Sequence, residues 1–300
     1  MNDQIKESAG YLWFICTIAA LGGLLFGWDV VVVSGAIPQV VKQFDLSSTQ
    51  LGILVSSVLW GCAMGSVAGG MILDSLGRKK GIILGAAILF ISAIWSSLSL
   101  SPLSLITARL IGGIGCGIAT TACPLYISEI SPEKHRGRMV TLYHLAVCTG
   151  IVLCVFANWG IFSFAQINMK TPLGIPFIKW FTVEQNWRAM LASEAVPGAL
   201  FLIFSSYLPE SPRWLVKQKR ISESTAILSR INSAEKARQI SSEIQGALSM
   251  EQSIHFLTLF TDRLRKPLVL GVSVCVLCEA CGISAVLYYG PQLFEQAGLS

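Results

Sequence analysis

Seven apolar stretches, each long enough to cross a lipid bilayer, constrain this chain more than any other feature. The sequence predicts membrane spans at 11–36, 49–73, 81–100, 104–127, 139–164, 187–208 and 267–294. A helix needs about 20 apolar residues to cross a hydrocarbon core about 30 Å thick. Only 13% of the residues are charged and 53% are hydrophobic, whereas a soluble domain carries about 25% charged residues. The expected fold class is therefore an all-α polytopic membrane protein.

Basic residues predict the orientation of these spans. If the N-terminus is inside, the inner segments hold Lys6, Arg78, Lys79, Lys80, Lys134, Arg136, Arg138 and the basic residues between Arg213 and Lys266. The outer segments then hold only Lys42, Lys170, Lys179 and Arg188. Cytoplasmic loops of membrane proteins carry an excess of Lys and Arg, so we expect a cytoplasmic N-terminus in the plasma (inner) membrane. The net charge of +5 then reflects topology, and no nucleic-acid partner is expected.

The distribution of polar residues divides the chain into three parts. Residues 1–208 are predicted to form a bundle of six transmembrane helices, and 209–265 a cytoplasmic connector of amphipathic helices. Residues 266–300 would supply the first helix of a second bundle. Pro172, Gly174 and Pro176 predict an irregular outer loop over 165–186. An odd number of spans, ending directly before Ser300, suggests a chain truncated after its seventh span.

Nine cysteines fall inside the predicted spans, where they are typical packing residues. Cys275, Cys278 and Cys281 form a C-x-x-C-x-x-C run that superficially resembles a metal site. Thiols at helical steps in an apolar span are more often packing residues, so we expect no metal and no cofactor. The lipid bilayer is an obligatory partner, and an oligomer is not required.

Four formally charged residues lie within the spans, namely Asp29, Arg109, Glu194 and Glu279. Such a residue costs roughly 2.5–3.5 kcal/mol to insert and usually faces a cavity or a partner. At about 1.5 Å per residue, Asp29, Arg109 and Glu194 share one depth in the outer third of the membrane. If Arg109 keeps one carboxylate ionised, the other can bind and release a proton. A static ion pair that fixes helix packing is the alternative.

Two further groups of polar residues occupy the fifth and seventh spans. His144 and Ile151 lie on one face of the fifth span, and Glu279 lies near the middle of the seventh. They could contact a polar solute or hydrogen-bond to neighbouring helices. Tyr288 and Tyr289 precede Gly290 and Pro291, which predict a helix break at a mobile gate. Interfacial anchoring by the tyrosines is the alternative.

Four stretches carry motifs that hydrophobic periodicity does not explain. They are Gly27-Trp28-Asp29 with Ser34-Gly35; Asp74-Ser75-Leu76-Gly77-Arg78-Lys79; Arg109 through Pro124, Tyr126, Glu129, Pro132, Arg136 and Gly137; and Trp187-Arg188 with Glu194 and the run Pro209–Leu215, PESPRWL. Together they resemble the sugar porter family of the major facilitator superfamily over nearly the whole chain. The resemblance implies twelve spans in two six-helix bundles, which rock to expose a central site alternately to each side.

The resemblance also implies roles for individual residues. The inner-gate network that holds the outward-open state corresponds to Gly77, Arg78, Glu129, Arg136, Glu210 and Arg213. Ion pairs at a water-exposed rim contribute about 1 kcal/mol or less each, so we expect them to break and re-form cheaply. Asp29 corresponds to the protonatable aspartate of proton-coupled members, with Arg109 and Glu194 as its partners.

Positions that contact sugar in the family depart from the family pattern in this chain. The expected amide side chains are replaced at His144, Ile151, Cys278, Glu279 and Ser284. Amides both donate and accept hydrogen bonds, which suits sugar hydroxyls. These replacements therefore make a basic, charged or modified solute an alternative to an ordinary hexose.

The resemblance leads us to expect a secondary active transporter that moves a sugar or polyol together with protons. A related carrier for a non-sugar solute, or a solute sensor that does not transport, is the alternative. An enzyme is not expected, because the sequence offers no nucleophile–base pair, metal set or phosphate loop.

Overall fold

The computed structural model describes residues 2–169, 175–250, 262–296 and 298, and the secondary structure of these residues is helical. The elements follow in this order: α1 (Asn2–Phe44), α2 (Ser48–Leu76), α3 (Arg78–Leu98), α4 (Pro102–Ile130), α5 (Arg136–Ile167), α6 (Pro176–Lys179), η1 (Trp180–Glu184), α7 (Asn186–Ser193), α8 (Ala195–Ser205), α9 (Pro212–Lys217), α10 (Ile221–Ile231), α11 (Ala234–Met250), α12 (Asp262–Ala280) and α13 (Ile283–Gln296).

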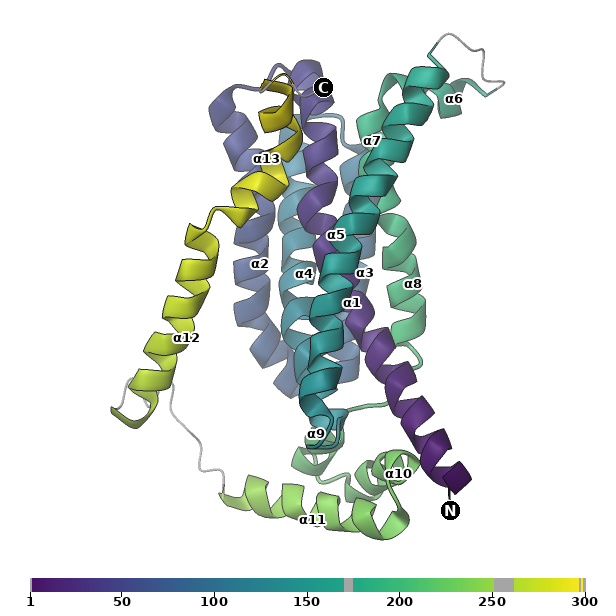
Figure 1. Cartoon of the computed structure of the whole chain (residues 1–300), viewed down its shortest axis with the longest axis vertical. Coiled ribbons are helices and arrows are strands. Elements are labelled where there is room, and N and C mark those ends of the chain that lie inside the picture. Colours follow the sequence, from purple (N-terminus) through teal and green to yellow (C-terminus); the bar gives the residue numbers. More distant parts are fainter. Residues whose placement is uncertain (1, 170–174, 251–261, 297, 299–300) are drawn as a thin grey trace.

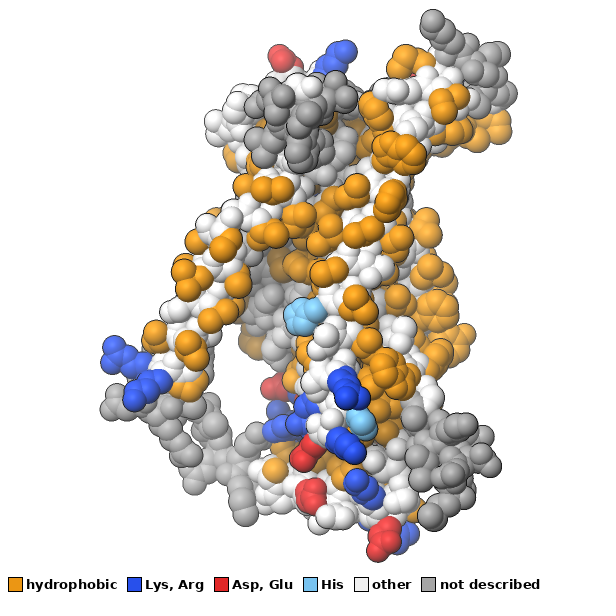
Figure 2. Space-filling model, in the orientation of Figure 1, with side chains coloured by type: hydrophobic (Ala, Val, Ile, Leu, Met, Phe, Trp, Pro, Cys, Tyr) orange, Lys and Arg blue, Asp and Glu red, His pale blue; other side chains and the backbone are white. Residues whose placement is uncertain are grey.

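Seven segments of the described chain are long and apolar enough to cross a membrane, as the sequence predicts. The sixth combines α7 and α8 over Asn186–Ser205, and the seventh runs over Arg265–Gly290 through α12 into α13. Figure 1 shows α1 to α5, α7 and α8 side by side as an upright bundle. Figure 2 shows hydrophobic side chains covering the middle of this bundle, with charged side chains gathered at the end that holds α9 to α11. The all-α membrane fold is confirmed.

Glycines allow the helices of the bundle to approach closely. α2 packs along α4, and α1 along α5. A Cβ at Gly113 of α4 would lie 3.0 Å from Gly61 Cα and from Cys62 N of α2. A Cβ at Gly150 of α5 would lie 3.0 Å from Leu24 Cα of α1. Small residues at such crossings allow backbone-to-backbone packing in lipid, and this packing fixes where polar side chains of α1 and α4 meet.

The segment after α5, which the sequence predicts to lie outside, contains more helix than expected. α5 continues to Ile167, and residues 176–184 form α6 and the π-helical turn η1, so the expected irregular loop over 165–186 is wrong for these residues. Pro176 occupies the first turn of α6, where its missing N–H costs nothing. Phe177 stacks on Phe181, with ring centroids 5.8 Å apart, and this contact accompanies the helical turns. Residues 170–174 lie outside the described residues.

The break in the seventh span lies earlier than expected. α12 ends at Ala280 and α13 begins at Ile283, whereas the helix continues through Gly290 and Pro291. The expected break at 290–291 is therefore wrong. Gly282 adopts φ 77°, a left-handed conformation that glycine tolerates and that ends a helix.

Three short helices lie in the predicted connector, at the end of the bundle that the sequence predicts to be the inner one. Figure 1 shows α9, α10 and α11 below the bundle, on the side where the N-terminus lies. Ser211 caps α9 by accepting a hydrogen bond from the Trp214 N–H at 3.3 Å, and α10 packs against both α9 and α11. The connector therefore contacts the inner ends of the spanning helices and positions the charged residues described below.

Candidate functional site

Three buried charges meet near the outer end of the bundle. Arg109 of α4 donates to Asp29 of α1 through two contacts: Nη1 lies 2.5 Å from Oδ1, and Nη2 lies 3.0 Å from the backbone oxygen. The same Nη1 lies 3.8 Å from Oε2 of Glu194. The exposed fractions are 2% for Asp29, 3% for Arg109 and 4% for Glu194. The structure thus brings together the one cation and two carboxylates whose depths the sequence predicts to match.

Glu194 occupies the junction between α7 and α8. The helical hydrogen bonding changes at this residue because Pro197, three positions later, has no N–H to donate to the preceding turn. Next to Asp29, Trp28 Nε1 donates to Ser193 Oγ at 3.3 Å. α1 and α7 are therefore linked at the level where Asp29 and Glu194 both face Arg109.

A second cluster holds α7 against α1 and α3 on the outer side. The Arg188 guanidinium stacks on the rings of Trp180 and Trp187, with its Cζ 5.0 Å and 4.3 Å from the ring centroids. Arg188 also donates to Ser97 O at 2.8 Å, and Trp187 Nε1 donates to Gln43 Oε1 at 2.7 Å. Residues 187–188 appear in the sequence motif, but only the structure shows their role in fixing α7.

The predicted solute-binding residues are distributed over three helices. His144 is exposed on α5, where its ring meets that of Tyr143 edge-on at 5.7 Å, and Ile151 is half-buried two turns later. Cys278 is exposed on α12 and Ser284 is half-buried on α13, while the side chain of Glu279 lies outside the described residues. Figure 1 shows α12 diverging from the bundle that contains α5.

The predicted tyrosine gate lies against the outer ends of α1 and α2. Tyr288 is 4% exposed and packs with Val33, Ile37 and Val55. Tyr289 is half-buried and contacts the same group. The tyrosines thus anchor α13 to the first bundle through an apolar contact.

A second charge cluster lies at the inner ends of α2, α3 and α4. Arg78 makes a bidentate contact with Glu129, because its Nε and Nη2 donate to the two carboxylate oxygens at 2.9 Å each. Glu210 Oε1 accepts the backbone N–H groups of Arg78 at 2.9 Å, Lys79 at 3.1 Å and Ser211 at 2.8 Å. Glu210 therefore holds the start of α3 at the point where the connector begins.

The Arg78–Glu129 ion pair is buried, so breaking it costs more free energy than expected from the sequence. The side chains of Arg78 and Glu129 are only 9% and 6% exposed, so their pair does not lie on a water-exposed rim. Removing one partner of a buried pair leaves an uncompensated charge and typically costs about 3–5 kcal/mol. The expectation of cheap, exposed ion pairs is therefore wrong for Arg78 and Glu129, because the connector covers them.

The shape of the α2–α3 turn depends on Gly77. Its φ is 94°, and a Cβ added there would lie 2.8 Å from Glu210 Cδ. The turn therefore requires glycine both for its backbone conformation and for the approach of the carboxylate.

Two residues of this cluster have motif positions but no role predicted from the sequence. Ser211 Oγ donates to Glu129 Oε2 at 2.5 Å. Asp74 forms ion pairs with Arg78 at 3.2 Å and with Lys217 at 3.3 Å. Its backbone oxygen accepts a hydrogen bond from Trp214 Nε1 at 3.0 Å. Asp74 lies in the motif at 74–79 and Ser211 in the motif at 209–215. Their place in these motifs is the only sequence feature that could have identified them.

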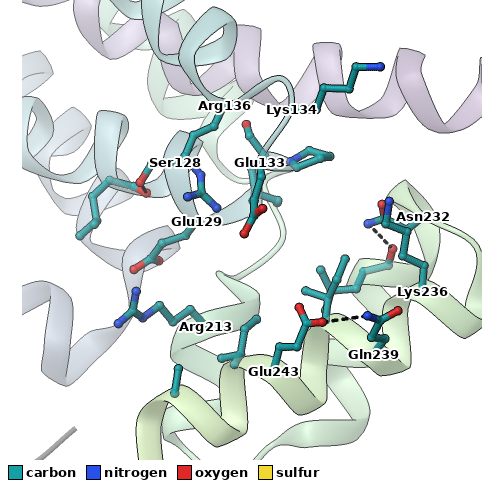
Figure 3. A pocket seen from close by; sticks show the side chains of 18 residues that line it. Ser128, Glu129, Glu133, Lys134, Arg136, Arg213, Asn232, Lys236, Gln239 and Glu243 are labelled. Atoms are coloured by element: carbon teal, nitrogen blue, oxygen red, sulfur yellow. Dashed lines mark hydrogen bonds between the residues drawn. The ribbon is translucent and has the colours of Figure 1, made fainter. Parts of the chain in front are cut away.

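Arg136 and Arg213, the remaining predicted inner-gate residues, line a cavity beside Glu129. Figure 3 shows both side chains directed toward Glu129 from different elements, Arg136 from the start of α5 and Arg213 from α9. Among the described residues no cluster of His, Cys, Asp and Glu could hold a metal ion.

Comparison with known proteins identifies the family of the chain. The family model "Sugar (and other) transporter" matches residues 15–300. The arabinose-proton symporter of Bacillus subtilis is 37% identical over 294 residues, covering 98% of this chain and 61% of that protein. The galactose-proton symporter of Escherichia coli K12 is 33% identical over 299 residues, covering 99% and 60%. The chain spans about 60% of the length of these relatives.

Solved structures of related proteins match the fold. The proton:xylose symporter XylE bound to 6-bromo-6-deoxy-D-glucose superposes with a TM-score of 0.79 at 29% identity, covering 98% of this chain and 64% of that chain. The inward-open conformation of XylE from E. coli gives 0.74 at 29% identity, covering 94% and 64%. The helical bundle thus has the major facilitator superfamily fold, which defines a class of membrane transport proteins. Within it, the chain belongs to the sugar transporter family, whose members are transporters and not enzymes.

Proposed function

We propose that this chain forms the proton-coupling half of a sugar transporter that works by alternating access. Residues 1–208 would be the N-terminal bundle, 209–265 the cytoplasmic connector and 266–300 the first helix of a second bundle. The single observation that carries the proposal is the buried contact of Arg109 with both Asp29 and Glu194. Charged residues within a membrane are costly to insert and often functional. A role in carrying protons would explain why these three are present.

The geometry suggests how a proton would change the cluster. Arg109 Nη1 is 2.5 Å from Asp29 and 3.8 Å from Glu194, so Asp29 is the closer partner. Protonation of Asp29 would remove its attraction for the guanidinium, and Glu194 would then become the better partner. Arg109 therefore keeps one ionised carboxylate throughout the cycle, while the other exchanges a proton. The shift of the Arg109 guanidinium from Asp29 toward Glu194 would alter the contacts between α1, α4 and the α7–α8 junction.

The solute is proposed to be a monosaccharide, since relatives bear the names of arabinose, galactose and xylose transporters. It would bind among His144, Ile151, Cys278, Glu279 and Ser284. Tyr288 and Tyr289 would close the outer side, because they already contact α1 and α2.

A polyol is the second candidate solute. The imidazole of His144 is exposed on α5, where an amide is expected for a sugar. The major myo-inositol transporter IolT of Bacillus subtilis is also 33% identical to this chain over 304 residues. A panel of labelled xylose, arabinose, galactose and myo-inositol would separate the two candidates.

The proposed location is the plasma (inner) membrane with the N-terminus in the cytoplasm. The end of the bundle that holds α9 to α11 also holds most of the charged side chains visible in Figure 2, and basic residues favour the cytoplasmic side. The inner-gate residues Arg78, Glu129 and Glu210 would then lie at the cytoplasmic end of the bundle and hold the two bundles in the outward-open state.

The test is uptake of a labelled sugar by cells that express the complete reading frame with Asp29→Asn. We expect the variant to lose accumulation against a gradient while keeping sugar exchange, because the proton site is gone and Arg109 retains Glu194. Asp45→Asn, an exposed carboxylate beyond the end of α1, is the matched control and should accumulate sugar normally.

Equal accumulation by Asp29→Asn and the parent protein would refute the coupling role. Saturable binding of a sugar without uptake by the parent protein would instead identify a sensor.

A further inference from the structure

A cavity of about 620 Å³ lies at the inner end of the molecule, between the connector and the ends of α4 and α5. This volume falls within the range of roughly 300–1,000 Å³ that is typical of small-molecule sites. Figure 3 shows side chains entering it from two sides, Glu129 and Arg136 from the bundle and Lys236, Gln239 and Glu243 from α11. The solute pathway proposed above does not use this cavity.

Positive charge prevails around the cavity. Four cationic side chains line it, namely Lys134, Arg136, Arg213 and Lys236. Three carboxylates also line it, namely Glu129, Glu133 and Glu243. The charge of Glu129 is balanced by the bidentate contact of Arg78, which comes from outside the lining, so the four cations face two carboxylates that this contact does not balance. Glu243 accepts a hydrogen bond from Gln239 at 2.9 Å. The charges therefore favour an anion over a cation.

The remaining lining indicates the shape of the anion. Leu125 and Ile130 of α4 line the cavity together with Ile240 and Ile244 of α11, and the two isoleucines of α11 are half-buried. The amide of Asn232 adds a polar group at the rim. A bare ion would leave this apolar part unfilled, whereas an organic phosphate could occupy both parts. Phosphate oxygens are strong acceptors for Arg and Lys.

We propose that this cavity is a binding site for a phosphate ester, with its phosphate among Lys134, Arg136, Arg213 and Lys236. Its organic part would lie against Leu125, Ile240 and the neighbouring apolar residues. Arg136 and Arg213 lie beside Glu129, so a bound phosphate would compete with that carboxylate for their charge. If the proposed transport function is right, cytoplasmic phosphate esters would then bias the inner gate.

The test is direct binding of D-glucose 6-phosphate to the purified chain in detergent, measured by isothermal titration calorimetry. Inorganic phosphate and nanodiscs containing phosphatidylglycerol are the comparison probes. Lys236→Gln should weaken binding roughly tenfold or more, because a charge-assisted contact with a phosphate oxygen is lost. Arg238→Gln is the matched control, since Arg238 is exposed on the same helix but does not line the cavity.

Each outcome decides the proposal. Saturable binding of glucose 6-phosphate that Lys236→Gln weakens and Arg238→Gln does not would establish the site for a soluble ester. The same difference between variants only in phosphatidylglycerol nanodiscs would assign the phosphate to a lipid headgroup. Equal weakening by both substitutions, or no saturable binding of any probe, would overturn the proposal. Because the readout is binding, a negative result leaves the transport proposal standing, and failed transport leaves this site standing.

Discussion

Gly77→Ala should destabilise the protein strongly, although it adds only one methyl group. The backbone of Gly77, with φ 94° and ψ 165°, lies in a region that is essentially confined to glycine. An L-residue held there costs on the order of 1–3 kcal/mol. The new Cβ would also lie 2.8 Å from Glu210 Cδ, well inside ordinary van der Waals contact, so the carboxylate must withdraw.

The withdrawal of Glu210 adds a second cost. Its Oε1 accepts three backbone N–H groups at 2.8–3.1 Å, and a hydrogen bond to a charged group contributes about 1.5–3 kcal/mol. Loss of one such bond together with the strain gives a total of about 2.5–6 kcal/mol. At about 2–4 °C per kcal/mol, the melting temperature should fall by roughly 5–24 °C.

The assay is thermal unfolding in detergent, followed by fluorescence-detected size-exclusion chromatography. Gly70→Ala is the matched control, because a Cβ there meets nothing within 4 Å and alanine favours the helix. Equal melting temperatures for Gly77→Ala and Gly70→Ala would refute the reasoning. Repeating Gly77→Ala in a Glu210→Ala background separates the two costs, since only the backbone strain should then remain.

Two further substitutions test the packing that positions the buried charges. Gly113→Val should lower expression and the melting temperature, because its side chain would collide with the backbone of Val58 and separate α2 from α4; Gly70→Val, at an open position, should cost far less. Trp187→Phe should destabilise by about 1–2 kcal/mol through loss of the hydrogen bond to Gln43, and an unchanged melting curve would show that this bond contributes nothing.

Hydrophobic length alone predicted much of the fold. A run of about 20 apolar residues in lipid forms a helix, because a helix satisfies its own backbone hydrogen bonds. The seven spans therefore agree with the structure to within a few residues over most of their ends. The predictions were wrong where local chemistry competes, as at Gly282, whose left-handed backbone ends α12, and at the aromatic contact between Phe177 and Phe181.

The candidate site was predictable in part. Equal depth along the helix axis follows from counting residues, so Asp29, Arg109 and Glu194 could be expected at one level. Whether they face each other depends on helix rotation, which the glycine crossings between α1 and α5 and between α2 and α4 determine.

The sequence by itself determined which segments cross the membrane, because transfer of apolar side chains into lipid depends on composition and length. Only the tertiary structure decided which charges are buried, since burial depends on what packs over them. Arg78 and Glu129 look like surface residues between two spans, yet the connector covers them and leaves less than a tenth of each side chain exposed. Their ion pair thus belongs to the interior because a distant segment of the chain folds over it.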